Sequence, residues 1–204
     1  MVHLYQALTW TIDVPERPRE YVIHAGGELL ANVTRVAISR PDDAAMPYAN
    51  PHAQHDENRI VVRAAGPDGT PYFYVDRTSN TTYPQPAFVV APNGALIGSV
   101  AARTGGMKGV LALFSGQTEG GYALLDAHGQ NLAIMVNPPL SDPRQEGTVT
   151  DSSGAEIARY AIDHSPYGDR RRRYTMRLRG TTPEPLRTLL FASLIGAELM
   201  SPTM

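Results

Sequence analysis

The sequence predicts a mostly β protein in which about twelve antiparallel strands close into a barrel around a hydrophobic C-terminal helix. Three observations lead to this fold class. Strand pairs joined by glycine turns recur along the chain, a lone helical segment near the C-terminus is apolar on nearly every side, and no shift in composition marks a domain boundary. Such a helix must be buried, and a large barrel has room for it. Residues 1–204 are therefore predicted to form one domain.

The first predicted strand is Tyr5–Ile12, which ends ahead of Pro15 and Pro18. The strand pairs that follow share a pattern around a glycine. A short apolar run precedes each glycine, and bulky residues follow it at the third and sixth positions. Glycine supplies the positive φ that a tight turn between antiparallel strands needs. The five glycines are Gly27, Gly69, Gly94, Gly129 and Gly154, and the predicted hairpins are Tyr21–Val33, Arg59–Val75, Phe88–Val100, Tyr122–Val136 and Thr148–Ile162.

The glycines are unevenly spaced, whereas a solenoid or a propeller would keep one period. Connections of unequal length suit an antiparallel barrel, whose closure leaves no strand edge exposed. Met107–Phe114 and Arg173–Leu178 are predicted as further strands, and Pro41–Asn58 as a long polar loop.

The C-terminal helix is predicted over residues 183–200. Thr182 suits the N-cap and Pro183 the first helical position. The segment is shorter than the roughly 20 apolar residues that cross a bilayer, and it contains Arg187 and Glu198. We therefore expect it to be buried in protein, with no transmembrane span.

Composition narrows the function classes. The formal net charge is −2, which does not indicate a nucleic-acid-binding protein. The absence of cysteine excludes disulfides, thiolate metal sites and cysteine nucleophiles. The first ten residues lack the basic and apolar regions of a signal peptide, so a cytoplasmic location, peripheral to a membrane if lipid is bound, is expected.

Three hairpins between Phe88 and Ile162, the segment Tyr174–Leu178 and the segment Leu189–Met200 together resemble the tubby C-terminal-like superfamily. This superfamily includes tubby proteins, phospholipid scramblases and LURP-one-related proteins, and the last two are the nearest likeness. The resemblance implies a twelve-stranded barrel around a central helix and a non-enzymatic binding module. The basic residues before the helix, Asp169–Arg173, differ from the acidic calcium-binding segment of scramblases, so calcium is not expected.

The densest charge cluster is the candidate anion site. Strand alternation places Tyr174, Met176 and Leu178 inward and the arginines between them outward. One interpretation is a site for anionic lipid or phosphate, because arginine binds phosphate oxygens bidentately. The other is a solvated outer face paired with carboxylates. The candidate residues are Arg170, Arg171, Arg172, Arg173, Arg177 and Arg179.

No catalytic residue, metal site or cofactor is predicted. His52–Glu57 contains metal-capable side chains, but a loop has no fixed ligand spacing and solvated loop charge is the simpler interpretation. Phe114–Gly116 lacks the flanking pattern of a hydrolase nucleophile, and Asp163–Ser165 are adjacent residues, which rarely form a triad.

Two functions lead at this point, and an enzyme whose site the sequence does not reveal is the third. The first is a binding module that contacts an anionic phospholipid or a protein partner. The second is a barrel that carries a small apolar ligand. The position of the helix separates them, because a helix inside the lumen would occupy the volume that a carried ligand needs.

Overall fold

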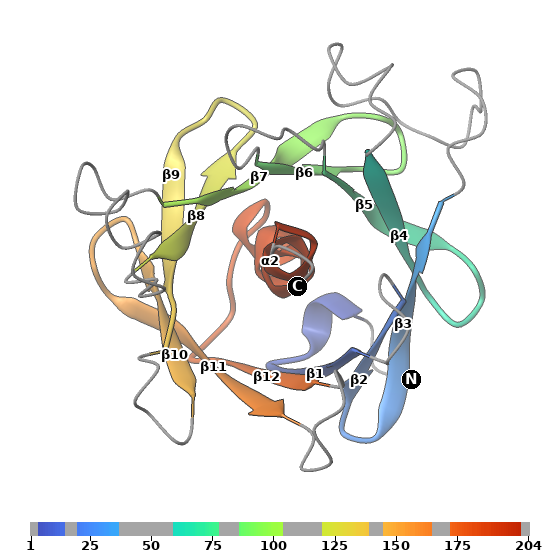
Figure 1. Ribbon diagram of the computed structural model, residues 1–204, viewed down its shortest axis with the longest axis horizontal. Coiled ribbons are helices and arrows are strands. Elements are labelled where there is room, and N and C mark those ends of the chain that lie inside the picture. The colour runs from blue at the N-terminus through green and yellow to red at the C-terminus, as the bar shows by residue number, and fades with distance from the viewer. Residues whose placement is uncertain are drawn as a thin grey trace.

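The computed structural model describes residues 4–14, 20–36, 59–77, 86–103, 120–138, 145–164 and 172–200. Within these residues, twelve antiparallel strands form a closed barrel around one α-helix, α2 (Figure 1). The predicted fold class is confirmed. The strands are β1 (Thr9–Val14), β2 (Tyr21–Ala25), β3 (Glu28–Arg35), β4 (Ile60–Ala65), β5 (Pro71–Arg77), β6 (Ala87–Val90), β7 (Leu96–Ala102), β8 (Gly121–Asp126), β9 (Asn131–Val136), β10 (Glu146–Asp151), β11 (Glu156–His164) and β12 (Arg172–Leu178).

Each strand pairs with its neighbours in the sequence, and β1 pairs with β12 to close the wall. The closing pair joins Thr9 to Arg177 and Val14 to Arg172. This pairing places residues from the two ends of the chain side by side on the barrel surface.

The five predicted turn glycines all have positive φ, between 79° and 87°. In four hairpins the glycine N–H donates to the carbonyl three residues earlier, as Gly129 does to Asp126 at 3.0 Å. The first hairpin differs, because Gly26 and Gly27 form a two-residue turn between the paired residues Ala25 and Glu28. Both turn types need positive φ, which explains the recurrence of glycine.

Every one of these hairpins contains a β-bulge at the third residue after the glycine. In the last hairpin, Val149 pairs with Ala158 and Thr150 with Glu156, so Ile157 is the extra residue. One extra residue reverses the inward–outward alternation of a strand. The third and sixth residues, which would face opposite sides of a regular strand, therefore both pack on the core. The bulged residues are Leu30, Tyr72, Ile97, Leu132 and Ile157.

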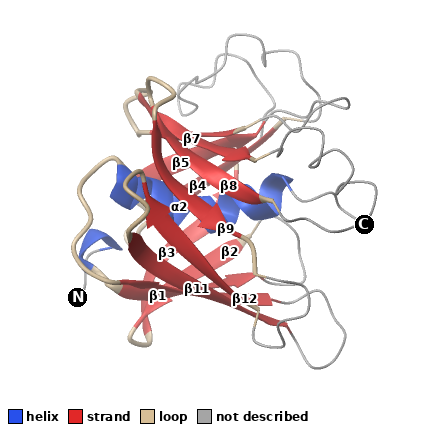
Figure 2. Cartoon of the chain, turned by 90° about the vertical axis from the view of Figure 1, so that its left-hand side faces the viewer, coloured by secondary structure: helices blue, strands red, loops and turns tan. Residues whose placement is uncertain are grey.

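The helix α2 (Leu186–Met200) runs through the lumen (Figure 2). Leu189, Phe191 and Leu194 are at most 2% exposed. The helix packs mainly against β5, β6, β7 and β8. A Cβ atom at Gly196 would lie 3.2 Å from the Val100 side chain, so glycine permits this close approach.

The opposite side of the lumen is filled from the N-terminus. A 3-10 turn, η1 (Leu4–Gln6), lies within the outline of the barrel in Figure 1 and at its end beside the start of α2 in Figure 2. The Trp10 ring stacks on the Phe191 ring with centroids 4.0 Å apart, and Tyr5 meets Phe191 edge-on at 6.1 Å. The prediction of a strand over Tyr5–Ile12 was therefore wrong at its start, because Leu4 and Tyr5 fill space that α2 leaves.

The helix begins three residues later than predicted. The residue before a proline disfavours helical geometry, so Pro185 excludes Glu184 from the helix. The carboxylate of Glu184, rather than Thr182, caps it by accepting from the Thr188 N–H at 3.3 Å and from the Thr188 hydroxyl at 2.8 Å. The predicted strand Met107–Phe114 and the whole of the predicted loop Pro41–Asn58 lie outside the described residues.

Replacing Leu194 with aspartate is expected to lower the free energy of unfolding by about 4 kcal/mol or more, because it buries an unpaired charge in the lumen. Leu8→Asp is the matched control, since Leu8 is 46% exposed and its replacement should cost less than about 1 kcal/mol. Urea unfolding followed by tryptophan fluorescence measures both. Equal losses would show that α2 is not buried.

A second prediction concerns the turns. Gly154→Ala forces alanine to φ near 86° and is expected to destabilise the protein by about 1–2 kcal/mol. Gly180→Ala provides the control, because Gly180 has open space around it and no positive φ. Its replacement should be neutral or stabilise by up to about 1 kcal/mol. The thermal unfolding temperature should fall for Gly154→Ala and should not fall for Gly180→Ala, and an equal fall in both variants would contradict this account of the turns.

Candidate functional site

The predicted arginine cluster lies on β12 and just after it. Tyr174, Met176 and Leu178 face the core, as predicted, and are 7%, 0% and 9% exposed. Arg173 and Arg177 point outward and are exposed. Arg179 is exposed directly after the strand, whereas Arg170 and Arg171 lie outside the described residues. The outer surface of β1, β12 and β11 is named here the arginine wall.

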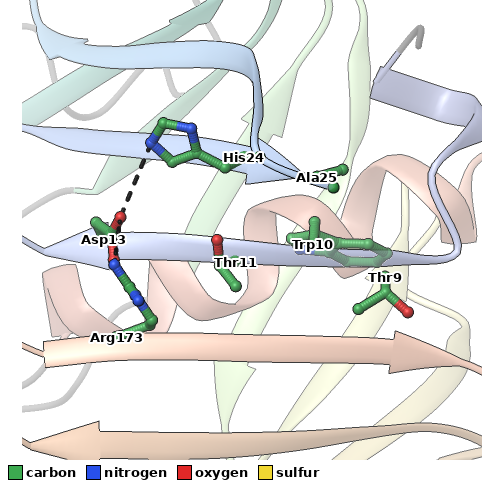
Figure 3. Close-up of a pocket in the computed structure, with 9 residues that line it drawn as sticks. Thr9, Trp10, Thr11, Asp13, His24, Ala25 and Arg173 are labelled. Atoms are coloured by element: carbon green, nitrogen blue, oxygen red, sulfur yellow. Dashed lines mark hydrogen bonds and ion pairs between the residues drawn. The ribbon is translucent and has the colours of Figure 1, made fainter.

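Arg173 is paired with a carboxylate from the other end of the chain. Its guanidinium donates to both Asp13 carboxylate oxygens, at 2.5 and 3.2 Å. This contact raises the pKa of Arg173. His24 Nε2 lies 3.8 Å from the same carboxylate (Figure 3). Asp13 and Arg173 are direct neighbours because β1 pairs with β12.

These residues border a surface hollow of about 350 Å³ between β1, the first turn and β12. Thr9 and Thr11 add hydroxyl groups to its lining (Figure 3). Both are outer residues of β1, so the hollow belongs to the arginine wall. It offers hydrogen-bonding groups and no free carboxylate, since Arg173 already engages that of Asp13.

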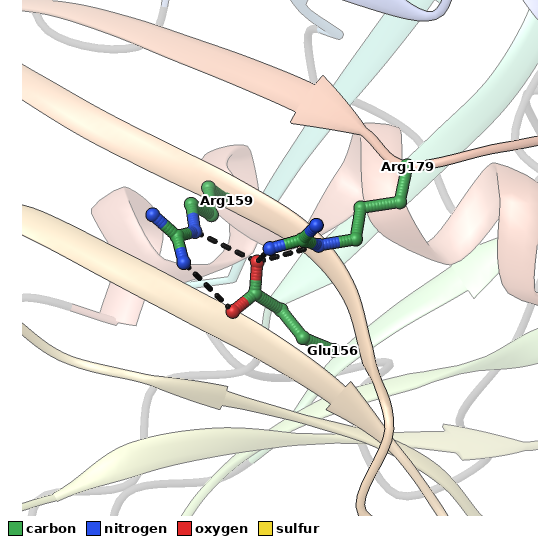
Figure 4. A network of polar contacts seen from close by, with 3 residues as sticks. All are labelled: Glu156, Arg159 and Arg179. Atoms are coloured by element: carbon green, nitrogen blue, oxygen red, sulfur yellow. Dashed lines mark hydrogen bonds and ion pairs between the residues drawn. The ribbon is translucent and has the colours of Figure 1, made fainter.

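Arg159 and Arg179 share one carboxylate, that of Glu156 (Figure 4). Arg159 donates to its two oxygens at 2.7 and 3.2 Å. Arg179 donates through Nε at 2.7 Å and through a terminal nitrogen at 2.5 Å. The hydrogen bonds from Arg159 and then from Arg179 lower the pKa of Glu156 to about 2. Glu156 thus stays ionised and holds the two guanidinium groups on either side of it.

Arg172 belongs to a different environment. It points toward the barrel mouth and donates to Glu198 of α2 at 3.1 Å. The Tyr174 hydroxyl also donates to Glu198, and burial followed by the charge of Glu198 raises the pKa of Tyr174. These contacts connect the helix to β12, so Arg172 has a structural role and is not available on the wall.

Arg177 differs from the other arginines of the cluster. Its neighbours in the pairing are Thr9 on β1 and Arg159 on β11. Among the described residues, no carboxylate forms an ion pair or hydrogen bond with Arg177. On the outer face, Arg173 and Arg179 are therefore paired with carboxylates, whereas Arg177 has no such partner among the described residues.

Sequence reasoning did not find Glu156, Arg159, Asp13 and His24. Glu156 and Arg159 follow the fifth turn glycine. The bulge in β11 determines which of its side chains face outward, so the bulge pattern could have placed both residues on the outer surface. The pairing of Asp13 with Arg173 carries no local signal, because 160 positions separate the two residues.

Metal-capable side chains do not gather among the described residues. No group of three or more His, Cys, Asp or Glu side chains lies close enough to hold a metal ion in these segments. His164 contacts Gln145 Oε1 at 2.7 Å, and its former triad candidate Ser165 lies outside the described residues. His52–Glu57 and Phe114–Gly116 also lie outside them.

In comparisons with known proteins, no family model, curated protein or solved structure matches this chain. The tubby-like resemblance therefore stays a prediction. None of the helices in the described segments is long and apolar enough to cross a membrane.

The Glu156 contacts predict a specific pH dependence. Its pKa is about 2 in the folded protein, against an ordinary 4.5. A lowered pKa means that Glu156 stabilises the fold above about pH 4.5, and that this contribution is lost as the pH falls toward 2. The Glu156→Gln variant should therefore lose less unfolding free energy than the wild type as the pH falls from about 4.5 toward 2. Urea midpoints between pH 2 and 7 measure it, with Glu20→Gln, an exposed residue outside the strands, as control. Parallel curves for the wild type and Glu156→Gln would contradict the assignment.

Proposed function

We propose that this protein is a non-enzymatic binding module of the tubby-like kind, which holds an anionic phospholipid or a protein partner on the outside of its barrel. The observation that carries the proposal is the filled lumen. Side chains of α2, η1 and Trp10 occupy the interior, where the described part of the core is closely packed. A barrel that contains its own helix offers its outer surface for binding.

The arginine wall supports an anionic partner. Arg177 is exposed and uncompensated within the described residues, and Arg159 lies directly opposite it. Like charges on opposing positions destabilise a sheet, so an external anion between them would be stabilising. Arginine forms bidentate, charge-assisted hydrogen bonds with both phosphate and carboxylate groups.

The alternative function, a carrier of small apolar ligands, has less support. A carrier pocket typically encloses 300–1,000 Å³ of mostly apolar space. Here Leu189, Leu190, Phe191 and Leu194 lie in the lumen, and none is more than 2% exposed. A carried ligand would have to displace part of α2.

Two titrations test the proposal. In the first titration, a dansyl-labelled fatty acid is added to the protein up to micromolar concentrations. No saturable one-to-one binding is expected, because α2 occupies the lumen. In the second titration, vesicles of equal phosphatidylcholine and phosphatidylserine are compared with pure phosphatidylcholine vesicles by co-sedimentation. If lipid is the partner, only the anionic vesicles bind, and Arg173→Gln/Arg177→Gln/Arg179→Gln weakens binding at least about tenfold.

A cooperative thermal unfolding transition well above the assay temperature must show that the triple variant is folded before its binding is interpreted. Saturable uptake of the fatty acid would overturn the proposal in favour of the carrier. If vesicle binding depends neither on the lipid charge nor on the three arginines, anionic lipid is excluded as the partner. The proposal then rests on a protein partner.

A further inference from the structure

The arginine wall contains more negative charge than an anionic-lipid surface would favour. Asp13 and Asp163 flank Arg173 in one row across β1, β12 and β11. Glu156 lies between Arg159 and Arg179. These carboxylates would face an anionic bilayer and repel it, and polybasic membrane-binding segments carry about 4–8 lysines or arginines. The wall instead offers isolated positive positions among fixed negative ones.

The uncompensated charge is that of Arg177, which lies in the row Thr9–Arg177–Arg159–Thr148 beside the paired Arg159. Opposing residues on antiparallel strands have Cβ atoms about 5 Å apart, so Arg177 and Arg159 are close neighbours. Arg159 and Arg179 hold the carboxylate of Glu156, and the charge of Glu146 on β10 also acts on Arg159. Neither carboxylate forms a hydrogen bond or ion pair with Arg177. Hydroxyl groups from Thr9 and Thr148 border Arg177 and Arg159.

Glu156 shows how this wall binds a carboxylate. Two arginines converge on it with four hydrogen bonds between 2.5 and 3.2 Å. Glu156 thereby fixes Arg159, so that less side-chain entropy is lost when a second carboxylate arrives beside it. Arg177 is positioned to receive that second carboxylate.

We propose, building on the binding function proposed above, that the arginine wall docks an acidic peptide segment of a protein partner, with one of its carboxylates on Arg177. Charge complementarity selects this partner, because separate carboxylates along a peptide can meet Arg177 and avoid Asp13 and Glu156. The hollow begins at Thr9, directly beside Arg177, and its hydroxyl groups and His24 can hydrogen-bond the residue next to the anchoring carboxylate.

The test uses fluorescence anisotropy with a fluorescein-labelled octaglutamate peptide, and octaglutamine as the uncharged probe. At low salt the full chain is expected to bind octaglutamate and not octaglutamine. Arg177→Gln should weaken binding about tenfold, the effect of losing one charged hydrogen-bond pair. Arg63→Gln is the matched control, because Arg63 is an exposed arginine on β4, away from the wall, and its loss should change the affinity less than twofold.

Thermal unfolding of both variants should match the wild type, since both residues are exposed. Equal weakening by the two substitutions, or no binding of octaglutamate, would overturn the inference. Phosphatidylserine vesicles that bind through Arg177 when octaglutamate does not would overturn it too, but would leave the proposed binding module standing. If neither probe binds and the fatty acid does, both proposals fail.

Discussion

The structure depends on the burial of α2 inside the barrel. Eight strands leave an interior that their own side chains can fill, whereas a wall of twelve strands is wider and needs another element. Here α2 fills the side next to β5–β8, and η1 with Trp10 fills the side next to β1. The helix also reaches the closing strands, through Phe191 on Trp10 of β1 and through Glu198 with Arg172 and Tyr174 of β12. Closing the barrel and filling it therefore share residues.

Apolar burial places the helix in the lumen but does not fix its position, because the hydrophobic effect has no direction. Hydrogen bonds of two helix residues supply that direction. The Arg187 guanidinium donates to the Ala7 carbonyl at 2.6 Å, and Glu198 accepts from Tyr174 and Arg172. Burial lowers the pKa of Arg187, and the Phe191 ring lies 5.8 Å from its charge. Arg187 and Glu198, the two charged residues that argued against a membrane span, thus tie one end of the helix to Ala7 and the other end to β12.

The sequence predicted features that depend on nearby residues and missed those that depend on closure. Turn glycines report a local backbone requirement, so all five hairpins were predicted at the correct positions. The bulges explain why bulky residues recur three and six positions after them, a spacing that fits no regular strand. The inner turn at Leu4–Gln6 was missed because its reason is the shape of the lumen. The candidate arginine face could be predicted on β12, but its carboxylates come from β1 and β11, whose register no single segment contains.

The arginine run illustrates why a dense charge cluster in a sequence is not a dense patch in space. Successive residues of a strand face opposite sides, so Arg172 turns to Glu198 at the barrel mouth while Arg173 turns to Asp13 on the wall. The remaining free charge is decided by register. Because β12 pairs with β1 at Thr9 and with β11 at Arg159, Arg177 receives one neutral neighbour and one of like charge. The candidate site is thus a consequence of how the barrel closes, and the number of arginines on the strand does not determine it.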